Sequence, residues 1–205
     1  TTAEAVRLVR DAKAKGLKVT CEVCPHHFAL SDDAVRSFNT NAKMSPPLRS
    51  TRHVEAIKAA LRDGTIDAIA TDHAPHTLQE KEQEFDYAPN GIIGLETAFG
   101  LTVTMLVEGE VLSLSQAIAR LTCEPARVFS LPKGTLSVGA DADVTIVDPT
   151  REWVVDVKSF ASKSRNSPFH GWKLRGEVLA TIVGGKVVWE REGKAKRSTE
   201  PLGPI

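Results

Sequence analysis

A carboxylate and two imidazoles follow a short apolar run near the middle of this 205-residue chain. Asp72, His73 and His76 lie within the hexapeptide TDHAPH, directly after residues 67–70, which have the pattern of a buried strand. The carboxyl ends of strands in α/β proteins are where ligands and metals bind, so these side chains are candidates for chemistry. An aspartate there can ligate a divalent metal and accept a proton from water. The alternative is that Asp72 begins a turn and both histidines face solvent.

Two further histidines and two cysteines lie at or near the end of another predicted strand, Lys18–Val23. His26 and His27 would come from a neighbouring strand end, but zinc sites need three or four protein ligands, and the chain does not show a complete set. Cys21 and Cys24 form a C-x-x-C pair. Because Cys21 alternates with valines along the strand, we expect it to be a small buried hydrophobe rather than a redox or zinc residue.

The elements that must position these residues alternate between helix and strand. We predict a helix capped at Thr1 and ended by Gly16, then the strand to Val23, a loop-like segment 31–50 with room for a short helix after Ser31, a helix ended by Gly64, and the strand 67–70. Such alternation is typical of a parallel sheet.

A long polar loop to about Pro89 follows, and Gly91 and Gly94 then introduce a helix that runs to about Glu108. The capping box Ser113-x-x-Gln116 predicts the start of the next helix, and Pro125 is expected to be the first residue of one more.

From about Lys133 the pattern changes to period-two runs of β-branched residues, which predict antiparallel strands. Gly184–Gly185 predicts a tight hairpin between two of them, and the last dozen residues are expected to be a frayed tail. We therefore predict two units, residues 1–132 and residues 133–205.

Charge and apolar content exclude some partners. The chain has 26 basic and 26 acidic residues, so its net charge gives no reason to expect nucleic-acid or membrane binding. No apolar run approaches the roughly 20 residues that span a bilayer. The 3 cysteines do not form a disulfide framework, which favours a reducing, cytoplasmic location.

Several motifs occur in one order along nearly the whole chain: VCPHH at 23–27, KMSPPLR at 43–49, ATDHAPH at 70–76, APNGIIGLET at 88–97, GADAD at 139–143 and SPFHGW at 167–172. Together they resemble the C-terminal portion of the dihydroorotases, cyclic amidases of the amidohydrolase superfamily. The resemblance implies the C-terminal part of a (β/α)8 barrel in residues 1–132. It implies the C-terminal strands of a small β-sandwich in residues 133–205.

The resemblance also implies a site and a reaction. The family holds one or two zinc ions and reversibly cyclises N-carbamoyl-L-aspartate to L-dihydroorotate in pyrimidine biosynthesis. Asp72 would ligate a metal and carry a proton from water to the leaving nitrogen, and His76 would bind the substrate carboxylate. Asn90 and Gly91 would contact the substrate ring. The last two residues assigned are Ser45, which stands where many members have a substrate-binding Asn, and His73, which would support Asp72 or the loop.

The other metal ligands of the family would lie upstream of Thr1. The chain opens on a helical pattern without Met, so we expect a C-terminal fragment of a longer enzyme that is inactive when isolated. We expect as partners a small-molecule substrate, the missing barrel portion and a second copy of the chain, with aspartate transcarbamoylase as a further candidate.

Three other interpretations stay open. One is another cyclic amidase, a dihydropyrimidinase or allantoinase, which shares Asp72 but generally lacks the His at position 76. The second is a non-catalytic dihydroorotase-like subunit that scaffolds a transcarbamoylase. The third is a β-rich binding module in residues 133–205, where no cluster of chemical groups is evident.

Overall fold

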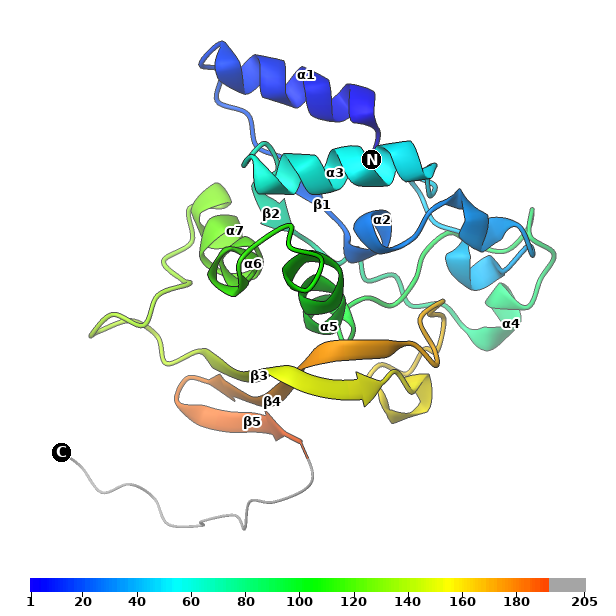
Figure 1. The fold of residues 1–205 in the computed structure, drawn as a ribbon. Coiled ribbons are helices and arrows are strands. Elements are labelled where there is room, and N and C mark those ends of the chain that lie inside the picture. The colour runs from blue at the N-terminus through cyan, green and yellow to red at the C-terminus, as the bar shows by residue number, and fades with distance from the viewer. Residues whose placement is uncertain (192–205) are drawn as a thin grey trace.

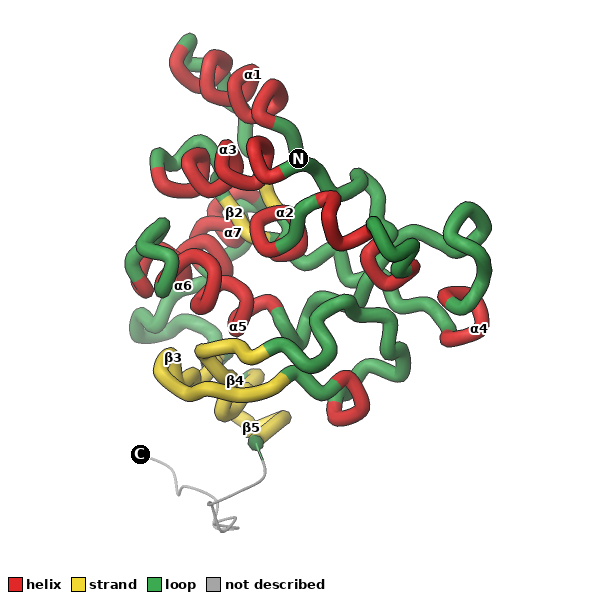
Figure 2. Tube along the Cα trace, turned by 45° about the vertical axis from the view of Figure 1, so that its right-hand side comes forward, coloured by secondary structure: helices red, strands yellow, loops and turns green. Residues whose placement is uncertain are grey.

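Helices and a pair of parallel strands precede a three-stranded antiparallel sheet in the computed structural model, which describes residues 1–191 (Figure 1). The chain is therefore of the α/β class. Figure 2, turned from that view, shows the antiparallel strands below the helices. None of the described helices is long and apolar enough to cross a membrane.

The first helix, α1 (Ala3–Ala14), begins one residue later than predicted. Its N-cap is Thr2, whose hydroxyl accepts a hydrogen bond from the amide of Ala5 at 3.1 Å, so the prediction of a cap at Thr1 was wrong. Glu4, the expected partner of that cap, instead pairs with Arg52 of α3 (Thr51–Arg62). The carboxylate thus ties the two helices together, and Figure 1 shows them side by side.

The parallel strands are shorter than predicted. Only Glu22–Val23 (β1) and Ala68–Ile69 (β2) pair, in the register Glu22 with Ala68 and Val23 with Ile69. At Cys21 the backbone amide bonds to a side chain instead of a strand carbonyl. The carboxylate of Asp67 accepts this hydrogen bond at 2.8 Å. The same carboxylate accepts the ammonium of Lys13 at 2.7 Å, which links α1 to the strands.

Short helices occupy the segments around the parallel strands. The sequence expectation of irregular structure at 44–49 holds, with a cis Ser45–Pro46 bond, but the polar loop after Asp72 contains an unpredicted helix, α4 (Leu78–Lys81). Thr77 and Glu80 form a capping box there, a signal that was present in the sequence. The other short helices are α2 (Pro25–Ala29) and the 3₁₀ turns η1 (Asp32–Val35) and η2 (Thr40–Ala42).

The helices of the second half also differ from prediction at their ends. The helix expected from residue 91 begins at Ala98, as α5 (Ala98–Thr102), and continues as the π-helical η3 (Val103–Val107). The capping box of Ser113 and Gln116 is confirmed at the start of α6 (Leu114–Leu121). Pro125 is the third residue of α7 (Cys123–Val128) rather than its first.

The antiparallel sheet has the order β3–β4–β5, with β3 spanning Val144–Val154, β4 spanning Lys173–Val183 and β5 spanning Lys186–Glu190. A further 3₁₀ turn, η4, spans Val157–Ser159. Gly184 and Gly185 form the predicted hairpin with positive φ. The segment α5–η3 packs directly on this sheet, since a Cβ at Gly176 of β4 would lie 2.7 Å from the Val103 side chain.

One hydrophobic core joins both sheets. Phe28 of α2, Leu101 of α5 and Leu174 of β4 are all almost fully buried and belong to the same cluster. The division into units 1–132 and 133–205 stays a prediction, and residues on both sides of it share this core. The tail expected after residue 193 lies outside the described residues.

Candidate active site

The parallel pairing of β1 and β2 brings two chemical segments to one edge. The pairing extends past the strands, where the Ala70 amide donates to the Val23 carbonyl at 3.0 Å. Cys24 and the VCPHH histidines therefore leave the sheet beside the segment that leads to Asp72. The negative charge of Asp72 acts to raise the pKa of both Cys24 and His27, so the carboxylate is close to this group.

Asp72 is solvent-exposed and has a left-handed backbone, with φ of +48°. Aspartate tolerates this conformation better than most residues, because its short side chain clashes little. The turn directs the chain away from the strand, and the exposed carboxylate is free to bind a metal or to take a proton. The expectation of a carboxylate at a strand end thus has a suitable geometry.

His73 supports the loop rather than Asp72. Its Nδ1 accepts hydrogen bonds from the amides of Gly94 at 3.2 Å and Leu95 at 3.4 Å. In the neutral ring the proton is therefore on Nε2. The Ala74 amide donates to the Ile92 carbonyl at 2.8 Å, so the hexapeptide runs alongside residues 92–95.

His76 and Asn90 lie in direct contact. The His76 Nε2 donates to the Asn90 carbonyl at 2.9 Å, and Nδ1 lies 3.7 Å from a carboxylate oxygen of Glu80. Hydrogen bonds from the amide and hydroxyl of Thr77 lower the pKa of Glu80, which keeps its charge beside the imidazole. A substrate carboxylate at His76 would have to share the Nε2 proton or use a proton on Nδ1.

Gly91 is required by its backbone and its surroundings. Its φ is +124°, and a Cβ there would lie 2.6 Å from the Cβ of Ala74. Its amide donates to the Lys43 carbonyl at 2.9 Å. The close approach lets the segment that carries Asn90 pack against the hexapeptide. Asn90, assigned to the substrate ring, is thereby brought next to His76, assigned to the substrate carboxylate.

Ser45 is exposed at the start of the cis bond to Pro46. The Pro46 carbonyl accepts a hydrogen bond from His27 Nε2 at 3.0 Å, which ties the KMSPPLR segment to α2. Ser45 therefore lies on a segment that is held next to α2.

Cys24, His26 and His27 form a cluster in which one ligand atom of each lies within 4.8 Å of the others. Burial and the adjacent His27 lower the pKa of His26 to about 3. At neutral pH its ring is therefore uncharged, with one nitrogen able to accept a hydrogen bond or bind a metal. Its Nε2 is buried without a hydrogen-bond partner in the described residues. Burial and the charges of Asp72 and Glu22 raise the pKa of Cys24 to about 12.

This donor set fits zinc, which binds cysteine sulfur and histidine nitrogen. It is the only group of three or more potential ligands found in residues 1–191, and it does not include Asp72. Sequence reasoning placed the two histidines beside the site and treated Cys24 as unimportant, because a strand pattern does not show that α2 folds these three side chains together. These residues could hold a metal, with Asp72 close by.

Three polar residues that the sequence did not single out donate hydrogen bonds to backbone carbonyls of the loop at 85–91. The Lys43 ammonium donates to the carbonyls of Phe85 at 2.6 Å and Ala88 at 2.7 Å. The Lys81 ammonium, which is buried, donates to the carbonyls of Pro89 at 2.8 Å and Gly91 at 3.2 Å. The third residue is Asn166, next to the quoted SPFHGW motif.

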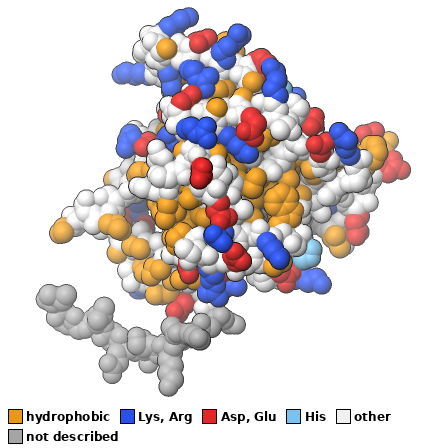
Figure 3. Space-filling model, in the orientation of Figure 1, with side chains coloured by type: hydrophobic (Ala, Val, Ile, Leu, Met, Phe, Trp, Pro, Cys, Tyr) orange, Lys and Arg blue, Asp and Glu red, His pale blue; other side chains and the backbone are white. Residues whose placement is uncertain are grey.

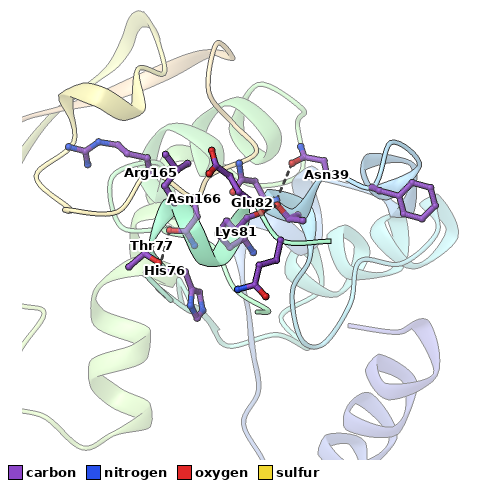
Figure 4. A pocket seen from close by; sticks show the side chains of 12 residues that line it. Asn39, His76, Thr77, Lys81, Glu82, Arg165 and Asn166 are labelled. Atoms are coloured by element: carbon purple, nitrogen blue, oxygen red, sulfur yellow. Dashed lines mark hydrogen bonds between the residues drawn. The ribbon is translucent and has the colours of Figure 1, made fainter. Parts of the chain in front are cut away.

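A polar cavity of about 480 Å³ opens beside His76. Figure 4 shows His76, Lys81, Asn166 and Arg165 among the side chains that line it. Two cationic side chains and an imidazole line the cavity together with one carboxylate, that of Glu82, so cationic side chains are in excess. Such an excess favours a ligand that carries negative charge. Asp72 is not among the lining residues, so this cavity does not include the strand-end carboxylate.

A carboxylate and histidines at the ends of adjacent parallel strands, with loops folded over them, define a member of the α/β proteins whose ligand site lies at a sheet edge. The chain belongs to the Amidohydrolase family, whose model matches residues 2–188. It is similar to proteins named dihydroorotase: 54% identical over 190 residues to that of Citrifermentans bemidjiense, and 56% identical over 192 residues to that of Geotalea daltonii.

These matches cover 93% and 94% of this chain and 45% of each relative, so the chain spans about half the length of the curated relatives. Among solved structures, the fold is similar to L-hydantoinase (dihydropyrimidinase) from Arthrobacter aurescens, with a TM-score of 0.87 and 32% identity over 96% of this chain and 44% of that one. Dihydropyrimidinase from Brevibacillus agri gives a TM-score of 0.86 and 27% identity, over 92% and 43%.

Proposed function

We propose that this chain is the C-terminal part of a dihydroorotase, which opens the cyclic amide of L-dihydroorotate and, in reverse, closes N-carbamoyl-L-aspartate. The observation that carries the proposal is the contact of His76 with Asn90 at 2.9 Å, beside a cavity lined by two cationic side chains and one carboxylate. A substrate that has both a ring amide and a carboxylate suits this pair. The names of the relatives support the same substrate.

The chemistry follows from two carboxylate oxygens on Asp72. Water adds to the ring carbonyl carbon, the carbon–nitrogen bond breaks, and one water proton passes through the Asp72 carboxylate to the leaving nitrogen. A zinc ion, when bound, would polarise the carbonyl and acidify the attacking water. Asp72 would contribute one oxygen to that ion, and the family's other ligands would lie upstream of Thr1. Cys24, His26 and His27 form a separate nearby cluster of potential ligands that does not include Asp72.

The proposal extends to architecture and partners. We propose that β1 and β2 are neighbouring strands of a (β/α)8 barrel and that β3–β5 belong to a small β-sandwich. The remaining barrel strands, a second copy of the chain and aspartate transcarbamoylase are its proposed protein partners. The reducing, cytoplasmic location expected from the cysteines, which are all unpaired, stays a prediction.

A second candidate function is hydrolysis of neutral cyclic amides, as the titles of the structural neighbours suggest. His76 separates the two candidates, because hydantoin and dihydrouracil have no carboxylate for an imidazole to bind. An imidazole at this position therefore favours the candidate with an anionic substrate.

The test is to assay the complete zinc-loaded enzyme on dihydroorotate, dihydrouracil and hydantoin under identical conditions. Dihydroorotate should be hydrolysed with the highest kcat/KM. Turnover of the two neutral amides with little or none of dihydroorotate would replace the proposal by the second candidate. Absence of turnover on all three in the metal-loaded enzyme would favour a non-catalytic, scaffold-like subunit.

A further inference from the structure

Asn166 is a buried side chain whose amide is fully used by two distant segments. Its Nδ2 donates to the carbonyls of Ala74 at 3.0 Å and Gly91 at 3.1 Å. Its Oδ1 accepts the amide of His76 at 3.2 Å. Only 3% of the residue is exposed, so these bonds form away from competing water.

The groups that Asn166 contacts belong to the two segments assigned to the substrate. Ala74 and His76 lie in the hexapeptide that begins at Thr71, and Gly91 follows Asn90. An amide that donates twice and accepts once fixes these backbones relative to each other with one rigid group. The Asn166 side chain comes from the segment before β4, 90 residues beyond His76, and adds to the direct bond from the Ala74 amide to the Ile92 carbonyl.

A second buried group acts on the same carbonyl. The Lys81 ammonium donates to the Gly91 carbonyl at 3.2 Å, alongside the Asn166 amide. Gly91 also approaches Ala74 so closely that a Cβ would be 2.6 Å from the Ala74 Cβ. The Gly91 peptide is therefore held from two sides, and Asn166 is the group that also reaches the His76 backbone.

We propose that Asn166 is a positioning residue of the substrate site, which sets the distance between His76 and the Asn90–Gly91 backbone. The proposal rests on the proposed function for its kinetic consequence. It also assigns a role to the second predicted unit, residues 133–205: that unit supplies the group which aligns the substrate-binding segments of the first.

The test compares Asn166→Ala with Lys163→Ala in the complete active enzyme. Lys163 is the matched control, because it lies on the same segment as Asn166 but is exposed and does not line the cavity. In Asn166→Ala we expect KM for dihydroorotate to rise about tenfold or more with a smaller change in kcat, since positioning of the bound substrate is lost. In Lys163→Ala both should stay near wild type.

Hydrogen–deuterium exchange of the free protein gives a readout that does not depend on activity. In Asn166→Ala the amides of His76 and Gly91 should exchange faster, while those within α3 stay protected. Equal acceleration throughout, or unchanged exchange at His76, would overturn the proposal. If the wild type does not hydrolyse dihydroorotate, the proposed function fails, and the exchange pattern still decides whether Asn166 links the segments.

A second variant covers the case in which Asn166→Ala does not fold. Asn166→Asp keeps the shape and can still accept the His76 amide, but it cannot donate to the Gly91 carbonyl. Exchange should then rise around Gly91 and remain slow at His76. Protection of both segments in this variant would show that the donated bonds are not what aligns them.

Discussion

Asp72 is the residue on which the proposed chemistry depends. It is exposed, it follows a paired strand end, and its charge reaches the Cys24 and His27 groups next to it. A carboxylate with this access can carry a proton between water and a leaving nitrogen. Its position near a cluster of potential metal ligands favours this role over that of a simple turn residue.

Replacing Asp72 with Asn removes the proton acceptor and the charge of the proposed metal ligand, while it keeps the shape of the side chain. Asparagine tolerates a φ of +48° as aspartate does, so the turn should be kept. We expect kcat on dihydroorotate to fall by about 10²–10⁴, with the midpoint of thermal unfolding within a few degrees of wild type. Steady-state kinetics and calorimetry measure the two quantities.

The control for that variant is Asp86→Asn, which removes an exposed carboxylate from the loop beyond α4. It should retain wild-type kcat. An Asp72→Asn enzyme as active as wild type would show that another group carries the proton.

At the scale of elements, the sequence predicted where strands and most helices lie, and missed how far they extend. A period-two pattern over 18–23 cannot show that the Asp67 carboxylate takes the Cys21 amide and ends the ladder. The capping boxes at Ser113 and Thr77 are local signals, so both were available in the sequence, although only the first was used.

The site residues show the same limit. Asp72, His76 and Gly91 could be proposed from the sequence because their types and motifs mark them, and their roles stay predictions. Asn166 and Cys24 could not be proposed, because their importance depends on contacts made by folding: Asn166 meets backbone groups far along the chain, and Cys24 faces two histidines across one short helix turn. Polar residues that bond to backbone carry no motif of their own.

The side chain of Lys81, the last residue of α4, makes the stability of the fold depend on pH. Burial and the neighbouring Lys43 charge lower the pKa of Lys81 to about 8, below the ordinary value near 10.4 in an unfolded chain. Between these values the folded state binds fewer protons than the unfolded state, so stability rises with pH across this window. The contribution is at most about 3 kcal/mol, and below pH 8 it no longer changes with pH.

Urea unfolding at pH 7.5 and pH 10 measures this contribution. Relative to Lys81→Met, the wild type should gain stability at the higher pH, and the exposed Lys15→Met should follow the wild type. A constant difference between wild type and Lys81→Met at the two pH values would contradict the assignment of a neutralised buried lysine.

For the whole molecule, many large apolar side chains are exposed among the described residues. Figure 3 shows hydrophobic side chains gathered across the middle of the face between α3 and the antiparallel sheet. A partly apolar cavity of about 470 Å³ is lined by residues of α5, α6, β3 and the preceding loop, among them Phe99, Ile118, Leu121, Leu136 and Val147. Contiguous exposed apolar surface is typical of interaction sites.

We expect the 205-residue chain on its own to associate in a concentration-dependent way. Sedimentation velocity should show larger species at higher concentration, and the double change Ile118→Glu with Leu136→Glu should reduce them. The matched control, Glu55→Ala at an exposed position of α3, should leave the larger species unchanged. A monomer at every concentration would argue against an interaction surface on this face.

The central claim is that His76 binds a substrate carboxylate. It is tested most directly by the ratio of kcat/KM on dihydroorotate to kcat/KM on dihydrouracil. This ratio is measured for the wild type and for His76→Gln. The account predicts that the wild type favours dihydroorotate, and that the ratio falls at least about tenfold in His76→Gln because a charge-assisted bond is lost. An unchanged ratio in the variant, or a wild-type preference for dihydrouracil, would contradict it.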